Sequence, residues 1–235
     1  MIRTEALNVD NDKYIYKTDL KFADEFCQEM LAKVKASTDN LIFRKNYDNA
    51  LKNPFDTYRT IGKSQSRELI RRARQVSQLY PDQKGIQFDQ YYLRPEDADK
   101  FLSLTPDFLK NIAKGEPVPI FQISKSGDLL QPHKGHKRKS SLFMLLEGNG
   151  EETRWYRETE PFEIIESTRI PDMDKVEHVV TARLEPGCWY VFNHLEWHSV
   201  HKFSTGVRMS IGLDFDSITA PELIDIIKKN HEWNR

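Results

Sequence analysis

The chain has 235 residues and a mass of 27.6 kDa, and its 35 Lys and Arg against 36 Asp and Glu give a formal net charge of −1. This length can bury a full core, while the balanced charge gives no polybasic basis for binding nucleic acid or membrane, so we expect neither partner. Two cysteines, Cys27 and Cys188, are too few for a disulfide framework or a Cys-rich zinc site. Because no long apolar run occurs, we expect a soluble, cytoplasmic protein, and the sequence leaves its oligomeric state open.

The N-terminal part is predicted to be mainly helical, because its apolar residues recur at three- and four-residue spacings. Helices are predicted over 19–37, 64–80, 95–104 and 106–115, and a strand over 85–93. The range 38–63 is rich in Asn, Asp, Pro and Gly and is predicted to be a long loop. Loops of this length are uncommon in compact domains unless they have a function, so 38–63 is a candidate lid over a site.

From Pro117 onward the chain changes to short β-branched and aromatic segments separated by turn signals. Strands are predicted over 118–124, 140–146, 153–156, 161–165, 177–184, 188–193, 198–203 and 207–215. This spacing predicts an α+β, mainly β fold, a double-stranded β-helix (jelly roll, cupin-like) with N-terminal supporting helices. We expect a helical support over 1–116, a jelly-roll core over 117–216 and a C-terminal helix within 217–235, together forming one structural unit.

The stretch QPHKGHKRKSSL at 131–142 contains a candidate histidine ligand for a metal but no carboxylate ligand. A carboxylate two positions after His133 would complete such a site, but that position is Gly135. Strand alternation places His133 and Gly135 on one face and His136 on the other. The same alternation in WHSVH separates His198 from His201. We therefore rank His133 and His198 as the candidate ligands, and expect His194 and His201 at the surface or rim of the barrel.

Arg208 and Ser210 share one face of the strand predicted at 207–215. A buried arginine requires a carboxylate, which its planar fork can hold with two hydrogen bonds, and a serine hydroxyl can add a third. No acidic residue of this strand lies on that face between them. A small dicarboxylate ligand would satisfy the pair.

The pattern H133-x-G135, H198 and R208-x-S210 on late short strands resembles the Fe(II)/2-oxoglutarate-dependent oxygenases. The surrounding PGCWYVFNHLEWHSV and GVRMSIGLDF are similar to the last strands of that superfamily, and the resemblance covers about 120–216. It implies that His133 and His198 bind Fe(II), and that Arg208 with Ser210 holds the distal carboxylate of 2-oxoglutarate. O2 is then the co-substrate.

Gly135 is the departure from the pattern, since most of the superfamily has Asp or Glu at that position. Two branches lack the carboxylate: the aspartyl/asparaginyl β-hydroxylase group, where water fills the gap, and the iron-dependent halogenases, where a halide such as chloride does. The resemblance therefore implies a vacant ligand position, a halide or water site, at Gly135. A turn glycine with no metal site is the alternative.

Three further residues are candidates for a substrate-facing or supporting role. His136 is expected to face the substrate or to support a ligand, because strand alternation turns it away from the metal. Arg138 is either an anchor for a carboxylate or a solvated charge at a strand edge. Trp155 is expected in the core or near the substrate.

We expect an iron-dependent dioxygenase that couples oxidative decarboxylation of 2-oxoglutarate to C–H hydroxylation of a small molecule or peptide. Halogenation, with halide at Gly135, is the alternative within the enzyme class. A catalytically silent jelly-roll binding module is the alternative outside it. The sequence does not identify the substrate.

Overall fold

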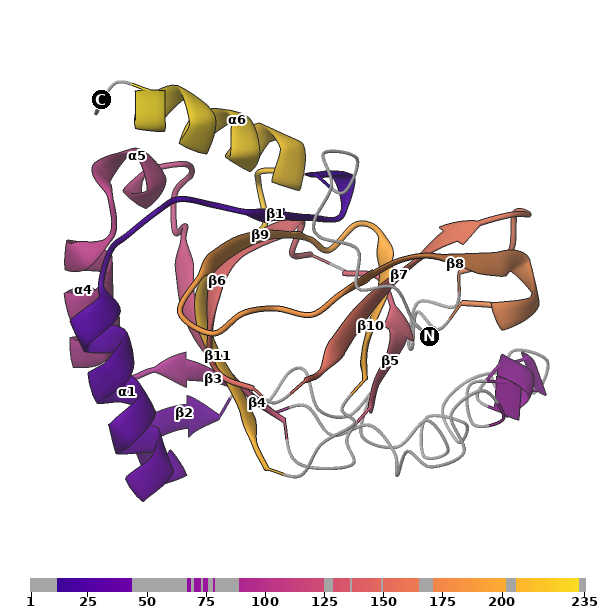
Figure 1. Cartoon of the computed structure of the whole chain (residues 1–235), viewed down its shortest axis with the longest axis horizontal. Coiled ribbons are helices and arrows are strands. Elements are labelled where there is room, and N and C mark those ends of the chain that lie inside the picture. The colour runs from indigo at the N-terminus through magenta and orange to yellow at the C-terminus, as the bar shows by residue number, and fades with distance from the viewer. Residues whose placement is uncertain are drawn as a thin grey trace.

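The computed structural model describes residues 12–43, most positions between 67 and 78, and 89–124, 129–135, 137–148, 150–164, 171–201 and 206–232. Its strands form two sheets that face each other, and helices cover the outer side of the larger one (Figure 1). All strand pairs are antiparallel. The predicted jelly roll is confirmed.

The larger sheet has seven strands in the order β1-β9-β6-β11-β4-β3-β2. These strands are β1 (Ile15–Lys17), β2 (Leu41–Phe43), β3 (Asp89–Leu93), β4 (Val118–Ser124), β6 (Ser140–Glu147), β9 (Trp189–Asn193) and β11 (Arg208–Phe215). The smaller sheet has four strands in the order β5-β10-β7-β8. These are β5 (Leu129–His133), β7 (Glu152–Glu158), β8 (Val176–Ala182) and β10 (Trp197–His201).

Four helices shield the outer face of the larger sheet: α1 (Asp24–Ala36), α4 (Pro95–Leu104), the single turn α5 (Asp107–Lys110) and α6 (Ala220–Glu232). The described positions between 67 and 78 are also helical, and short 3-10 turns occur at η2 (Thr38–Asn40) and η5 (Met173–Lys175). Phe26 and Met30 of α1 and Phe101 of α4 pack with Trp189 and Ile211 of the sheet in the main apolar core. Across the described ranges, no helix has both the length and the apolar character that crossing a bilayer requires.

Strand alternation separates two apolar layers on the larger sheet. Trp189 and Val191 of β9 point toward the helices, whereas Tyr190 and Phe192 point between the sheets. There Phe192 and Phe143 meet Trp155 of β7 in a second apolar cluster. One end of the space between the sheets is not filled by apolar side chains. Polar residues, among them His133, His198 and Arg208, line it instead.

Most of the predicted elements in the described ranges are present, with local corrections. Residues 161–164, predicted to begin a strand, lie in no strand, and the helix predicted over 106–115 is only the short α5. Strand β5, which carries His133, was not among the predicted strands.

The N-terminal part is not only a helical support, because β1, β2 and β3 all join the larger sheet. Residues 38–43 of the predicted loop form η2 and β2, and β2 pairs with β3. The remainder of the candidate lid, 44–63, lies outside the described residues. The predicted boundary at residue 116 stays a prediction, although paired strands occur on both sides of it.

Candidate active site

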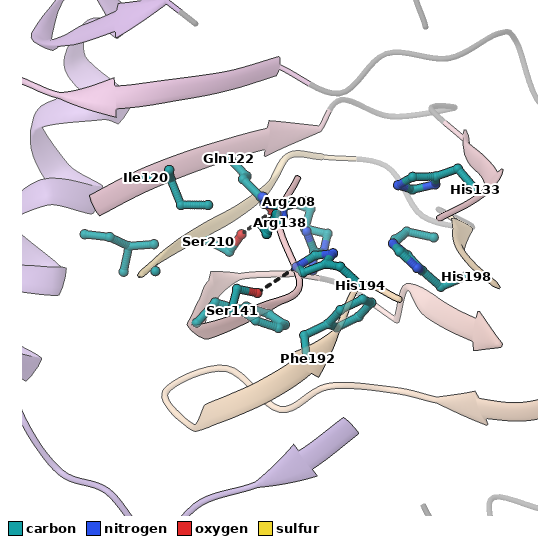
Figure 2. A pocket seen from close by; sticks show the side chains of 14 residues that line it. Ile120, Gln122, His133, Arg138, Ser141, Phe192, His194, His198, Arg208 and Ser210 are labelled. Atoms are coloured by element: carbon teal, nitrogen blue, oxygen red, sulfur yellow. Dashed lines mark hydrogen bonds between the residues drawn. The ribbon is translucent and has the colours of Figure 1, made fainter. Parts of the chain in front are cut away.

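A cavity of about 40 Å³ lies between the two sheets, large enough for a few water molecules. Its walls come from both sheets and from the loops after β5 and β9 (Figure 2). They include His133, His198, Arg138, His194, Arg208, Ser210, Gln122, Ser141, Phe143 and Phe192. The predicted ligand histidines and the predicted carboxylate-binding arginine thus line one cavity.

His133 and His198 lie directly opposite each other on the neighbouring strands β5 and β10. Their ring centroids are 4.2 Å apart, and the residues are 4% and 2% exposed. Nδ1 of His198 lies 2.8 Å from the backbone oxygen of Glu196, so this nitrogen is the donor and Nε2 keeps its lone pair. A hydrogen bond of this kind fixes the orientation of metal-binding histidines.

Burial and electrostatics keep His198 neutral. Desolvation, and then the neighbouring His133, hold the pKa of His198 well below its usual value of 6.5. A metal ligand must be neutral imidazole, so the environment of His198 favours the ligating form.

A polar cluster beside the two histidines links β5 to β10 and β7. Lys134 Nζ donates to Glu158 Oε1 at 2.8 Å, and Trp197 Nε1 donates to the same oxygen at 2.7 Å. Lys134 Nζ also lies 4.8 Å from the centre of the Trp197 ring. The Lys134 hydrogen bond is the main cause that lowers the pKa of Glu158. Since Lys134 follows His133 and Trp197 precedes His198, this cluster holds the backbone at both histidines.

Arg208 lies on β11 of the opposite sheet and is 6% exposed. Burial lowers its pKa, an effect that the negative charge of Glu151 partly offsets. Within the described ranges, no carboxylate comes close enough to form an ion pair with Arg208. Ser210 Oγ donates to Gln122 Oε1 at 3.4 Å on the same face. A buried guanidinium in this state favours an anionic ligand.

Arg138 is not a solvated charge at a strand edge, because its guanidinium is mostly buried and pairs with a carboxylate. Its Nη1 donates to both carboxylate oxygens of Asp214, at 2.9 and 3.0 Å, and its side chain is 13% exposed. Asp214 also accepts a hydrogen bond from Gln90 at 3.4 Å. Arg138 therefore ties the loop after β5 to β11 while it lines the cavity.

Gly135 does not face open space. A Cβ atom added there would lie 2.5 Å from the backbone oxygen of Arg138 and 2.8 Å from Cβ of His194. The Gly135 N–H also donates to the backbone oxygen of His194 at 2.6 Å. A side chain at position 135 would thus point into protein atoms, and not into an open ligand position.

Substitution of Gly135 by alanine is therefore expected to destabilise the fold rather than to add a ligand. Overpacking against backbone atoms costs typically about 1–3 kcal/mol, and urea unfolding would measure the loss. Gly150→Ala is the control, because open space surrounds that position and only its φ of +79° opposes a side chain. A smaller loss for Gly135→Ala than for Gly150→Ala would contradict the close packing.

The prediction that His194 and His201 lie at the surface or rim is wrong. His194 is 5% exposed and lines the cavity, and His201 is fully buried. Trp155 is also fully buried and packs on Phe192 with ring centroids 5.4 Å apart, so it supports the cavity wall from behind. His136 lies outside the described residues, and its role stays a prediction.

His201 forms a buried network on the other face of β10. Its Nε2 lies 2.6 Å from Ser199 Oγ, which in turn lies 2.9 Å from Tyr156 Oη. Desolvation, and then the charge of Arg154, lower the pKa of His201 to about 3.

Acid is therefore expected to destabilise the protein partly through His201. Between about pH 6.5 and 3 the unfolded chain binds a proton at His201 that the folded chain does not, so stability present above pH 6.5 is lost as the pH falls. Between pH 7.5 and 5 the loss is about 2 kcal/mol. Urea unfolding at both pH values should show a smaller difference for His201→Asn, and an unchanged difference would exclude this cause.

The donor set fits an Fe(II) ion in part. The paired imidazoles of His133 and His198, with the outer nitrogen of His198 on a backbone carbonyl, are of the type that binds iron. In the described part of the chain, no group of three or more His, Cys, Asp or Glu side chains could hold a metal ion. Two histidines are thus the ligands that the described residues can offer, and small molecules would complete the coordination.

Comparison with known proteins gives similarity in fold only. No protein-family profile and no curated protein sequence matches the chain. A prolyl-4-hydroxylase from Pseudomonas putida is 15% identical, with 88% of this chain and 95% of that chain covered and a TM-score of 0.44. YcfD, a ribosomal oxygenase from Escherichia coli, is 17% identical over 59% of this chain and 33% of that chain, with a TM-score of 0.34.

A vicilin and a cysteine peptidase also match. Vicilin from hazelnut (Corylus avellana) is 15% identical over 57% of this chain, with a TM-score of 0.33. The chain spans 31% of the length of that vicilin and 50% of Peruvianin-I, a cysteine peptidase from Thevetia peruviana latex. None of these likenesses indicates an activity, and the function must be argued from the site itself.

Proposed function

We propose that the protein is an Fe(II)/2-oxoglutarate-dependent oxygenase that hydroxylates a C–H bond of a small molecule or peptide. The observation that supports the proposal most is the composition of the inter-sheet cavity. It has a pair of buried imidazoles on the smaller sheet, of which His198 is held neutral, and a buried arginine on the larger sheet. In the described part of the chain this arginine has no ion pair. A metal ion chelated by a dicarboxylate would match this site, because the imidazoles would bind the metal and the arginine would bind the free carboxylate.

Each residue has one role in this proposal. His133 and His198 would hold Fe(II) through their inner nitrogens, and Arg208 with Ser210 would bind the carboxylate of 2-oxoglutarate far from the metal. Phe192, whose ring centroid lies 4.8 Å from that of His198, and Phe143 supply apolar walls that exclude water. When bound, iron supplies the activation of O2, and 2-oxoglutarate supplies two electrons as it becomes succinate and CO2.

A bound dicarboxylate would displace the few water molecules that this cavity can hold. Gln122 and Ser210 hydrogen-bond to each other at 3.4 Å, near the upper limit for such a contact. We expect a ligand carboxylate to replace this weak hydrogen bond, so that Ser210 donates to the carboxylate instead.

Hydroxylation is the lead reaction and halogenation the alternative. Without a carboxylate at position 135, the open coordination position would take water in a hydroxylase and a halide in a halogenase. We therefore expect the mass of the product to be the same in chloride and in bromide. A brominated product would favour halogenation instead.

A silent binding module with this cavity would bind a carboxylate without turning it over. Succinate release from 2-oxoglutarate separates the two classes, measured aerobically with Fe(II) against pools of metabolites and peptides. The proposal predicts release that a substrate stimulates and that His198→Ala abolishes. His178→Ala, on the exposed part of β8, is the matched control that should retain release. If the parent released no more succinate than His198→Ala in every pool, the proposal that the protein is an enzyme would be contradicted.

A further inference from the structure

His194 occupies the middle of the cavity, between the His133–His198 pair and the arginine end (Figure 2). It follows β9, and its ring centroid lies 5.5 Å from that of His198 and 4.8 Å from that of Phe192. The residue is 95% buried, since only 5% of its surface is exposed. Nothing in the proposed roles above uses this imidazole.

The loop after β5 holds the backbone of His194 on two sides. The His194 N–H donates to the backbone oxygen of Lys139 at 3.0 Å, and the His194 oxygen accepts from the Gly135 N–H at 2.6 Å. Any side chain at position 135 would collide with Cβ of His194. The glycine that breaks the usual ligand pattern is therefore the residue that lets His194 enter the cavity wall.

The hydrogen bond of the ring assigns its tautomer. Nε2 lies 2.9 Å from Oγ of Ser141, a buried hydroxyl for which the described residues offer this one partner. A buried hydroxyl is best satisfied when it donates its proton, and we infer on this ground that Nε2 accepts from Ser141 and that the ring proton is on Nδ1. Nδ1–H is then a buried donor for which the described part of the chain provides no acceptor.

A buried donor of this kind is rare in folded proteins and indicates an acceptor that arrives from outside. The cavity that His194 lines also contains the guanidinium groups of Arg138, which Asp214 balances, and of Arg208, which has no ion pair in the described part of the chain. An acceptor next to the Arg208 guanidinium is best supplied by an anion with oxygen atoms.

We propose that His194 is a ligand-binding residue of this cavity, whose Nδ1–H donates a hydrogen bond to a carboxylate oxygen of the bound 2-oxo acid. The inference rests on the proposed function for the identity of the ligand. It assigns to the chain a third anion-recognising side chain besides Arg208 and Ser210. It also gives Ser141 a positioning role, because the Ser141 hydroxyl fixes the tautomer.

The test compares 2-oxoglutarate affinity in the Mn(II)-loaded protein for three variants. His194→Phe keeps a ring without a donor, and we expect about 10- to 100-fold weaker binding, as for the loss of a hydrogen bond to a charged group. His194→Asn places an amide N–H close to the position of Nδ1, and we expect it to restore most of the affinity. His178→Phe is the control outside the cavity and should bind as the parent does.

Metal affinity, measured without 2-oxoglutarate, should be the same in the parent and in both His194 variants. Unchanged 2-oxoglutarate affinity in His194→Phe, with weak binding in Arg208→Ala, would overturn the inference and leave the proposed function standing. A parent that binds no 2-oxoglutarate at all would overturn both.

NMR of the parent labelled with 15N-histidine tests the tautomer directly and does not depend on how the variants fold. We expect the His194 signals to show the proton on Nδ1, and the Nδ1 signal to shift when 2-oxoglutarate is added. A proton on Nε2, or signals that do not respond to the bound ligand, would overturn the assignment.

Discussion

Replacement of Arg208 by alanine is expected to weaken 2-oxoglutarate binding by about 2–5 kcal/mol, roughly 30-fold to several thousand-fold. The guanidinium is buried on β11 and, in the described part of the chain, has no ion pair to compete with a ligand. Its removal would leave the ligand carboxylate in a desolvated cavity without a charged donor. Calorimetric titration of the Mn(II)-loaded protein measures the difference.

Two controls separate this effect from general damage. Arg208→Lys keeps the charge but not the planar fork, so intermediate affinity is expected. Arg157→Ala removes an exposed arginine that pairs with Glu177 on the smaller sheet, and should leave the affinity unchanged. Metal affinity should be the same in all four proteins, and equal 2-oxoglutarate affinity in Arg208→Ala would remove Arg208 from the site.

Replacement of His133 or His198 by alanine is expected to abolish metal binding. The described residues offer two imidazoles at this place and no third protein ligand to retain the ion. Loss of an outer-shell partner already costs about 10- to 100-fold in metal affinity, and loss of one of two ligands should cost more. Competition with a fluorescent chelator measures the affinity for Fe(II), Co(II) or Mn(II).

The matched control for the ligand variants is His178→Ala, which removes a histidine of β8 outside the cavity. It should bind metal as the parent does. If His198→Ala retained the metal affinity of the parent, the ion would bind elsewhere and the paired histidines would not be a metal site.

Much of the fold could be predicted from local patterns. Strand β4 at Val118–Ser124 and helix α4 at Pro95–Leu104 lie where periodicity and the helix-starting proline placed them. The three-residue strands β1 and β2 could not be found in this way, because so short a segment has no periodicity. Their place depends on pairing with β9 and β3, which are distant in sequence or separated by a long connection.

The candidate site was predictable where alternation along a strand decides the direction of a side chain. His198 and Val200 line the cavity and His201 does not, as the two-residue period of β10 requires. Arg208 and Ser210 share the cavity for the same reason on β11.

Residues in loops escaped this reasoning, because their direction depends on contacts between distant segments. His194 is buried since its backbone bonds to Gly135 and Lys139, some 55–59 residues earlier in the chain. Arg138 pairs with Asp214, and the space beside Gly135 is filled by the backbone oxygen of Arg138 and by Cβ of His194. A histidine directly after a strand that begins with four apolar residues, at His194 after Trp189–Asn193, was a signal available in the sequence.

The central claim is that this cavity binds a metal and 2-oxoglutarate together, and anaerobic absorption spectroscopy tests it most directly. Fe(II) and 2-oxoglutarate are added to the protein without oxygen, and the weak visible charge-transfer band of the chelate is recorded. We expect the band in the parent and in His178→Ala, no band in His198→Ala, and a band in Arg208→Ala only at much higher 2-oxoglutarate concentration. No band in the parent at saturating Fe(II) and 2-oxoglutarate, or an undiminished band in His198→Ala, would contradict the account.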